Sequence, residues 1–578
     1  MKIKKENILL KFMNRDKTQF WREISKMNTL PHKNIVSIDG KNVPDKITEI
    51  FDNKYRNILD NANCQTENTC SFSGRVFTEM PKPLIAASHI SVAIEKLNTG
   101  VGWDGYHSNL FKFSGPIFRN LLGKFMNMML SHSYVPSAMS HGEIRPVIKS
   151  KIISKYDSDN YRPVMNSCMI LKIFEYCLLP YLTKSLKLSS RQFGYRKNTG
   201  CLPAIALVKE TIDKYNSENS NVHCAVVDLS KAFDCVNKNI LFEKLRCTSL
   251  NRSIVDVLNF MYCNTSVNTV FNGVGSNPWQ IGNGVRQGGI LSPLLFSFYV
   301  NEAMETISDM KVGCSINGYK TNIIGYADDL LCMAPTIEGL QMIIDQLYLF
   351  LDNLCLNVNA GKCKHLIFKS KRFKSFPGDP AIFLNGVRIS RESEYKYLGV
   401  MLNGDADKNS EINRVMESFL KQFNGLYSKF HYVTRDVLRY LFKTYTSSFY
   451  GIELWYDKIP ASLLDKMSVT YHKAVKRISG HNVWDSNHDA CETAGVYVFK
   501  HLLAKRMLCF WHNLTKSKSP CLGNLRYFFR HSSSIFLKLN KLFHDVYSVD
   551  ILDNPLCAII SRIGYVQRTE PRSHYVPA

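Results

Sequence analysis

Three aspartates stand at the ends of apolar segments, where a carboxylate is costly to bury. Residues 224–229 form an apolar strand pattern that contains Asp228 near its end. Residues 323–333 hold two apolar runs on either side of a polar tip that includes Asp328 and Asp329, and this pattern predicts a hairpin. A divalent metal compensates the charge of adjacent carboxylates in such apolar surroundings.

The hairpin by itself fits two interpretations equally well. Asp328 and Asp329 could simply make a turn, because aspartate is common in turns. The separate strand that ends in Asp228 favours metal, since phosphoryl transfer by two Mg²⁺ ions roughly 3.5–4 Å apart needs carboxylates from different strands. We therefore predict that Asp228, Asp328 and Asp329 hold two Mg²⁺ ions, for which Mn²⁺ could substitute.

The segments that flank the acids must hold them in place. We expect residues 323–324 and 330–333 to pair as antiparallel strands and to pack on a helix. That helix begins near Thr336, which can cap it, and runs to about Cys355. Its apolar face recurs at steps of three and four residues: Leu340, Ile343, Ile344, Leu347, Leu351 and Leu354.

The remaining parts of the chain differ in character. Residues 1–80 are polar, rich in Asn and Lys, and weakly periodic, so we expect a poorly packed extension. Apolar spacing from Ile412 to Phe430 predicts a long helix, and helical patterns continue to about residue 515. Residues 501–578 hold 11 Lys and Arg against 4 Asp and Glu, which suits either a nucleic-acid surface or a solvated tail.

The composition indicates a large folded protein with an anionic partner. With 578 residues, 45% of them hydrophobic, the chain has enough apolar material for several cores, which excludes wholesale disorder. The formal net charge of +24 suits nucleic acid, and less often an anionic membrane surface. No apolar run approaches the roughly 18 residues of a membrane span, and no secretion signal opens the sequence. We expect an intracellular protein that makes no membrane contact.

The cysteines point to thiols and not to disulfides. Their number, 17, is odd and their spacing irregular, so we expect buried thiols in an intracellular chain. Cys509, His512 and Cys521 are spaced too irregularly to predict a zinc site.

Several motifs resemble those of a known family. Tyr326-Ala327-Asp328-Asp329 resembles the signature of reverse transcriptases, and residues 228–234 (DLSKAFD) and 284–296 (GVRQGGILSPLLF) resemble palm motifs of the non-LTR retrotransposon (LINE-type) branch. Further motifs follow the family's order: Asn160-Tyr161-Arg162-Pro163 and Gln192-Phe193-Gly194-Tyr195 before, Asn359-Ala360-Gly361-Lys362 and Tyr397-Leu398-Gly399 after. The resemblance runs from about residue 102 to about residue 480.

The resemblance implies an α+β right-hand polymerase with a mostly helical C-terminal region. We expect an N-terminal extension (1–80), fingers with an upstream segment (81–225) and a palm with an antiparallel sheet (226–402), the reverse transcriptase domain covering about 132–402. A helical thumb and connection (403–500) and a basic C-terminal region (501–578) would follow.

The resemblance also implies roles for single residues. Asp228 and Asp328 correspond to the metal-bridging carboxylates, and Asp329 to a third acid of less stringent role. Phe233 corresponds to a ring under the incoming sugar that excludes a 2′-hydroxyl, although an ordinary core phenylalanine is the alternative. We expect Asp234 to be a structural cap.

Other residues are expected around the nucleotide. Gln287 and Gly288 would lie over it, and Tyr326 beside it. Arg162 and Lys149 would hold the triphosphate, and Lys362 would protonate the leaving pyrophosphate. Gly289 and Ile290 replace the family's frequent Cys-Pro, which affects fine selectivity and not the reaction.

The implied activity is that of an RNA-directed DNA polymerase that uses an RNA template, a DNA primer or target DNA, and deoxynucleoside triphosphates. We expect it in the nucleus and cytoplasm as a ribonucleoprotein, with no obligate protein partner. Two alternatives remain: a non-catalytic or domesticated nucleic-acid-binding remnant, and a group II intron-type maturase. No endonuclease pattern accompanies the motifs, so we expect either a truncated copy or cleavage supplied by another protein.

Overall fold

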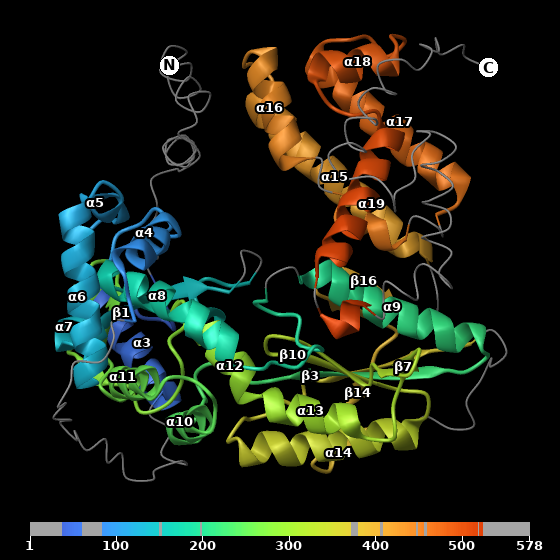
Figure 1. Cartoon of the computed structure of the whole chain (residues 1–578). Helices are drawn as coiled ribbons and strands as arrows, with labels where there is room; N and C mark the ends of the chain where they lie inside the picture. Colours follow the sequence, from blue (N-terminus) through green and yellow to red (C-terminus); the bar gives the residue numbers. More distant parts are fainter. Residues whose placement is uncertain are drawn as a thin grey trace.

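The computed structural model describes residues 37–59, 84–149, 153–196, 199–370, 380–404, 408–446, 449–455, 459–517 and 519–523, and it is a mixed α+β structure. The predicted basic region 501–578 therefore lies outside the described residues from 524 onward. In Figure 1 a sheet with helices on both of its faces occupies the lower right, a second group of helices and strands lies to its left, and the C-terminal helices rise above the sheet.

The central sheet carries the acids. Its strands follow the order β14-β11-β3-β10-β9, and they are antiparallel except for the pair β11–β14. The bounds are β3 (Val222–Asp228), β9 (Ile323–Tyr326), β10 (Asp329–Ala334), β11 (Lys364–Phe368) and β14 (Ser390–Arg391). The expected hairpin of residues 323–324 and 330–333 is confirmed as β9 and β10.

Side chains of the central strands alternate between two cores, as a strand period of two requires. Ala225 and Val227 of β3 face the core built with α13 (Asn301–Asp309) and α14 (Ile337–Asn353) below the sheet in Figure 1. Cys224 and Val226 face the core built with α9 (Cys201–Ser217) and α19 (Phe499–Lys516) above it. The strand ending in Asp228 is thus buried on both faces.

The helix predicted after the hairpin is confirmed. Thr336 caps α14 by accepting a 3.1 Å hydrogen bond from the Gly339 amide, and all six predicted apolar residues are buried. Helix α12 (Ser292–Tyr299) begins at Ser292 and has a proline in its first turn.

A second sheet stands beside the first and packs against several helices. Its strand order is β2-β1-β4-β5, with β6 also paired to β4. The strands are β1 (Gly142–Ile148), β2 (Tyr161–Ser167), β4 (Ser266–Phe271), β5 (Val274–Gly275) and β6 (Trp279–Gln280). The helices of this part are α4 (Ala87–Glu95), α5 (Ser108–Lys112), α6 (Pro116–His132), α7 (Ser137–Ser140), α8 (Met169–Ser185), α10 (Lys238–Arg246) and α11 (Arg252–Cys263).

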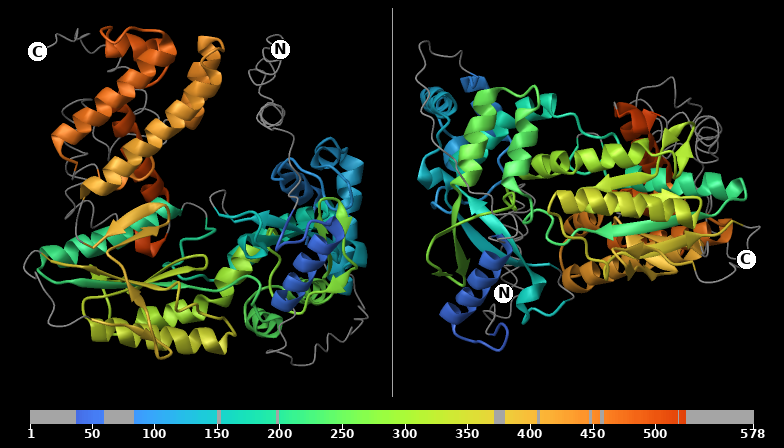
Figure 2. Two further views of the ribbon diagram at one scale, coloured as in Figure 1. Left: turned by 180° about the vertical axis from the view of Figure 1, so that it is seen from behind. Right: turned by 90° about the horizontal axis from the view of Figure 1, so that it is seen from below.

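The expectation of a poorly packed N-terminal extension is wrong for residues 37–59. Helix α3 (Pro44–Leu59) buries Phe51 and Tyr55 against the second sheet, and Figure 2, right, shows the blue helix beside these strands. Its polar Asp52 is also buried. Hydrogen bonds compensate this burial, because Oδ1 accepts at 2.7–2.9 Å from three side chains of the β4–β6 region, those of Thr269, Ser276 and Trp279.

The described part of the chain from residue 408 onward is mostly helical, as expected. It comprises α15 (Lys408–Phe430), α16 (Arg435–Tyr445), α17 (Ala461–Ser479), α18 (Asn487–Ala494) and α19. The helix predicted over 412–430 is confirmed within α15. Met507 and Trp511 of α19 pack into the core above the central sheet, so this stretch of the predicted basic region is part of the folded body.

Small hairpins complete the described residues: β7 with β8 (Ser315–Ile316, Tyr319–Lys320), β12 with β13 (Phe383–Leu384, Val387–Arg388) and β15 with β16 (Glu394–Tyr397, Val400–Asn403). The described cysteines are all free thiols, as predicted. Among the described helices, none is both long and apolar enough to cross a membrane.

The Asp52 cluster predicts the stability of α3. Replacing Asp52 by Asn should lower the free energy of unfolding by about 2 kcal/mol, because a neutral amide oxygen accepts the three buried donors more weakly and the amide NH₂ cannot accept the hydrogen bond from Arg56. The control Asp45→Asn changes an exposed acid of the same helix and should alter stability by less than about 0.5 kcal/mol. Urea unfolding of the two variants measures both values, and equal losses would contradict this role for Asp52.

Candidate active site

The three acids meet at the ends of neighbouring strands. Asp329, the first residue of β10, stands directly opposite Asp228, the last residue of β3, and it also faces Tyr326 across the hairpin. Ala327 and Asp328 form the two-residue tip, with Ala327 in the left-handed conformation at φ 60°. Opposed like charges and a strained alanine both cost free energy, so other contacts must fix this geometry.

Gln192 holds the strained tip from the neighbouring loop. Its Oε1 accepts a 2.9 Å hydrogen bond from the Ala327 amide, and its Nε2 donates to the Ala327 carbonyl at 3.3 Å. A Cβ on Gly194 would approach the Ala327 nitrogen to 2.5 Å, so only glycine fits there. No local pattern indicates this role of Gln192, because its partner Ala327 is 135 residues away along the chain.

The electrostatics of the acids show an uncompensated negative charge. Burial, followed by the charges of Asp328 and Asp228, raises the pKa of Asp329 to about 6. Burial and the charge of Asp228 also raise the pKa of Asp328. Lys362 forms an ion pair with the cluster, but its Nζ lies 3.8 Å from Asp228 Oδ2 and its side chain is 65% exposed, so its compensation is weak.

The donor set fits a hard divalent cation. Carboxylate oxygens are the ligands of Mg²⁺ and Mn²⁺, and Mg²⁺ usually takes one or two carboxylates together with substrate phosphates and waters. Within the described part of the chain, no group of three His, Cys, Asp or Glu side chains could by itself hold a metal ion, so the predicted set of Asp228, Asp328 and Asp329 stays a prediction. Asp228 and Asp328 would therefore hold the metal together with oxygens of the substrate.

A cavity of about 820 Å³ opens in front of Asp228 and Asp328. It also contains most of the residues predicted to contact a nucleotide: Lys149, Arg162, Phe233, Gln287, Gly288 and Lys362. Asp329 and Tyr326 are not among its lining residues. A hydrogen bond with Cys201, followed by burial, raises the pKa of Tyr326 to about 12, and the ring packs on the core above the sheet. Its contact with a nucleotide stays a prediction.

One wall of the cavity combines an aromatic ring and a glycine. Phe233 stacks on Phe296 with ring centroids 4.7 Å apart, and the half-buried ring also lines the cavity. It is therefore both a core residue and a cavity residue. Gly288 has φ 108°, and a Cβ there would come within 2.8 Å of the Met165 carbonyl oxygen, so a side chain is excluded on two grounds.

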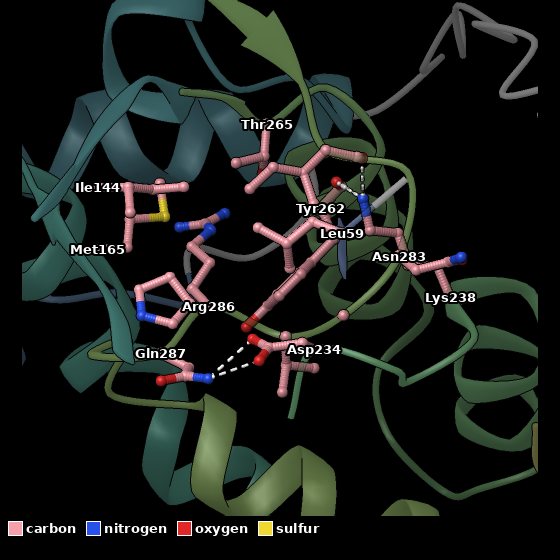
Figure 3. A pocket seen from close by; sticks show the side chains of 14 residues that line it. Leu59, Ile144, Met165, Asp234, Lys238, Tyr262, Thr265, Asn283, Arg286 and Gln287 are labelled. Carbon is pink, nitrogen blue, oxygen red and sulfur yellow. Dashed lines mark hydrogen bonds between the residues drawn. The ribbon is translucent and has the colours of Figure 1, made fainter. Parts of the chain in front are cut away.

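Asp234 is not the helix cap that the sequence analysis expected. The cap of α10 is Asn237, whose side chain accepts from the Ile240 amide. Asp234 instead accepts hydrogen bonds from Gln287 Nε2 at 2.8 Å on both carboxylate oxygens, as Figure 3 shows. Burial raises the pKa of Asp234 to about 6, although this hydrogen bond opposes the shift. Asp234 therefore sets the orientation of the Gln287 amide.

A buried ion pair supports the loop that carries Gln287. The Arg286 Nη1 atom lies 3.6 Å from Glu175 Oε1, and the Arg286 guanidinium stacks 4.8 Å from the centroid of the Tyr262 ring. The second oxygen of Glu175 accepts a 2.8 Å hydrogen bond from the Ile290 amide. The loop is thus fixed at both ends by one side chain of α8.

Cations line the same cavity as the acids, and we call this group the cationic wall. Arg162 and Lys149 line the cavity from β2 and from the residue after β1, and Lys149 Nζ donates to the Asp159 carbonyl at 2.6 Å. Burial and then the charges of Lys362, Lys54 and Arg162 lower the pKa of Lys149, which shows how closely these cations gather. A concave site lined by both acids and cations suits a metal-bound polyphosphate.

Comparisons with known proteins identify one family and several similar sequences. Residues 153–402 match the family described as reverse transcriptase (RNA-dependent DNA polymerase). The chain is 25% identical over 331 residues to the Retrovirus-related Pol polyprotein from type-2 retrotransposable element R2DM of Drosophila melanogaster, covering 56% of this chain and 30% of that protein. It is 24% identical over 372 residues to the RNA-directed DNA polymerase from mobile element jockey of Drosophila funebris, covering 61% and 39%. These matches thus span less than half the length of either relative.

A solved structure of apo telomerase from Candida tropicalis, truncated from its C-terminal domain, matches with a TM-score of 0.32 and 12% identity. The match covers 53% of this chain and 62% of that chain.

The raised pKa of Asp329 predicts a pH dependence. A carboxyl whose pKa rises on folding favours the folded state in its protonated form, so this contribution is present below about pH 4 and is lost as pH rises through about 6. In metal-free buffer, the Asp329→Asn variant should therefore gain in melting temperature relative to the parent as the pH rises from 4 to 7. Adding Mg²⁺ should shrink the difference. A difference that is constant with pH would contradict the clustering of the acids.

Proposed function

Because residues 153–402 belong to the reverse transcriptase family, distantly related to the enzymes of non-LTR retrotransposons, we propose that this chain is an RNA-directed DNA polymerase. The observation that carries the proposal is the pair Asp228, at the end of β3, and Asp328, on the tip of the β9–β10 hairpin, which line one cavity together with Arg162 and Lys149. The substrates would be an RNA template, a DNA primer or target DNA, and deoxynucleoside triphosphates, handled in the cell as a ribonucleoprotein.

In this proposal the elements form a right hand. The central sheet with α13 and α14 is the palm within 226–402, the second sheet and its helices belong to the fingers within 81–225, and α15 to α18 form the thumb within 403–500. Strands β4 to β6 and helices α10 and α11 also belong to this part although they lie inside the palm range, because β4 pairs with β1. Basic residues on the thumb would contact phosphates of the template–primer duplex without reading its sequence.

The reaction joins the primer to a nucleotide. The primer 3′-hydroxyl attacks the α-phosphorus, a new P–O bond forms, and pyrophosphate leaves with its electron pair. Bound Mg²⁺ would supply charge neutralisation on the phosphate oxygens and lower the pKa of the hydroxyl. Asp228 and Asp328 would hold the ions, Arg162 and Lys149 would orient the triphosphate, and Lys362 would donate a proton to the departing pyrophosphate.

Selection of the sugar would fall to Phe233. Its ring is fixed by stacking on Phe296, so it cannot move away from a ribose 2′-hydroxyl that enters the cavity. Gln287, oriented by Asp234, and Gly288 would contact the nucleotide from the same cavity.

Loss of the first acid tests the activity directly. Asp228→Asn should reduce extension of a DNA primer on an RNA template by at least about 100-fold, the scale of losing one strong electrostatic contact in an active site. Asp352→Asn, an exposed acid on α14, is the matched control and should extend like the parent. Binding of the template–primer by both variants shows that the fold is intact. Equal extension by parent and Asp228→Asn would refute the assignment, and a parent that binds but never extends would favour the non-catalytic alternative.

The role of Phe233 predicts a change in substrate choice. Phe233→Val should raise the kcat/KM for a ribonucleotide relative to the matching deoxynucleotide, by about tenfold or more, because the smaller side chain leaves room for the 2′-hydroxyl. Single-nucleotide extension with each substrate measures the ratio. Val285→Ala, at a fully buried position nearby that does not line the cavity, is the control for a looser core. An unchanged ratio in Phe233→Val would make Phe233 only a core residue.

A further inference from the structure

Helix α3 lies outside the residues that match the reverse transcriptase family, yet it reaches the proposed nucleotide site. Lys54 and Ile58 are among the lining residues of the cavity that contains Asp228 and Asp328. The helix is 94 residues before the start of that match, counted from Leu59 to residue 153. An element outside the matched residues thus contributes to the wall of this cavity.

Two anchors make α3 a fixed part of the wall. Asp52 accepts from three side chains of the β4–β6 region, and its Oδ2 accepts from Arg56 at 2.7 Å. Burial alone would raise the pKa of Asp52, but these hydrogen bonds outweigh it and lower the pKa. At the helix end, the Leu59 carbonyl accepts a 2.8 Å hydrogen bond from the Asn283 amide, next to the loop that carries Gln287. Lys54 thus stands between two fixed points.

Two side chains, a carboxylate and a hydroxyl, bind the Lys54 ammonium at the cavity. It pairs with Asp159 Oδ1 at 2.5 Å and donates to Ser158 Oγ at 3.2 Å. The Asp159 side chain is 85% exposed, whereas that of Lys54 is only 18% exposed, so the ion pair is well solvated on the acid's side. An ion pair with an exposed carboxylate contributes little free energy, so a more highly charged anion such as a phosphate can replace that carboxylate.

Lys54 belongs to a group of cations that line the same cavity. Lys149 donates to the main-chain oxygen of the same Asp159, and the charge of Lys54 helps to lower the pKa of Lys149. Cations crowded in this way repel one another, so a polyanion between them relieves the repulsion. A triphosphate whose α-phosphate lies near Asp228 and Asp328 would extend its tail toward this wall.

We propose that Lys54 binds the triphosphate of the incoming nucleotide, so that α3, outside the matched domain, completes the nucleotide site. The inference rests on the proposed polymerase function. In the absence of nucleotide, Asp159 holds the ammonium; when the triphosphate enters, its phosphate oxygens replace the carboxylate as acceptors.

Nucleotide binding to the full chain tests this. The dissociation constants of dTTP with Mg²⁺, of inorganic tripolyphosphate and of thymidine are measured by calorimetry, and steady-state extension gives the KM for dTTP. Lys54→Gln should weaken dTTP and tripolyphosphate by about tenfold, the effect of losing one charge-assisted hydrogen bond, and leave thymidine unchanged. Lys54→Arg should bind nearly as the parent does. Lys46→Gln, an exposed lysine of the same helix, should bind like the parent.

A second variant separates phosphate binding from a structural ion pair. If the pair only fastens α3, Asp159→Asn should have the same effect as Lys54→Gln on the melting temperature and on dTTP affinity. If Lys54 binds phosphate, Asp159→Asn frees the ammonium and dTTP should bind at least as tightly as to the parent. Equal dTTP affinity in Lys54→Gln and the parent overturns the proposal, whatever the melting temperatures show.

Failure of the polymerase proposal gives a different result. A parent that binds dTTP but does not extend primers refutes the polymerase function, and the dTTP affinity of Lys54→Gln still decides the role of Lys54. A parent that binds neither dTTP nor tripolyphosphate refutes both.

Discussion

Repulsion among three carboxylates is the constraint on which the rest of this structure depends. Asp228 and Asp329 face each other across a strand pair, and Asp328 sits beside them on a strained two-residue tip. The fold resists the repulsion by burying both strands between two cores and by binding Ala327 through Gln192. Burial first, and then the repulsion that remains, raise the pKa values of Asp328 and Asp329, and both effects would favour a bound cation.

The cavity walls are linked to the acids by main-chain hydrogen bonds. The segment that follows Asp228 is joined to the Gln287 loop through Val285, whose amide donates to the Phe233 carbonyl at 2.8 Å. That loop is joined to β2, because the Met165 amide donates to the Gln287 carbonyl at 2.7 Å. Acids, aromatic wall and cationic wall are thus parts of one connected body, so a nucleotide positioned by the walls is also positioned relative to the acids.

Local patterns in the sequence were enough to predict the hairpin and α14. Thr336 caps the helix through a neighbour three residues away, and the apolar steps of α14 repeat within single turns. The gathering of Asp228 and Asp328 on one cavity is predicted by acids at the ends of two apolar segments and by the resemblance of motifs. The features that the sequence does not predict depend on distant partners. Asp52 binds residues that are 217 to 227 positions away along the chain, and Gln287 binds Asp234, which is 53 positions away. No local spacing reveals such pairs, so α3 looked like an unpacked polar extension and Asp234 like a cap.

The central claim is that Asp228 and Asp328, together with the substrate, form one cation site. Electron paramagnetic resonance of Mn²⁺ bound to the full chain, with template–primer ending in a dideoxynucleotide and the matching deoxynucleoside triphosphate, tests it most directly. We predict that the parent binds two ions tightly only when the nucleotide is present, and that the Asp228→Asn, Asp328→Asn double variant loses both under the same conditions. The same two tightly bound ions in the double variant would contradict the account.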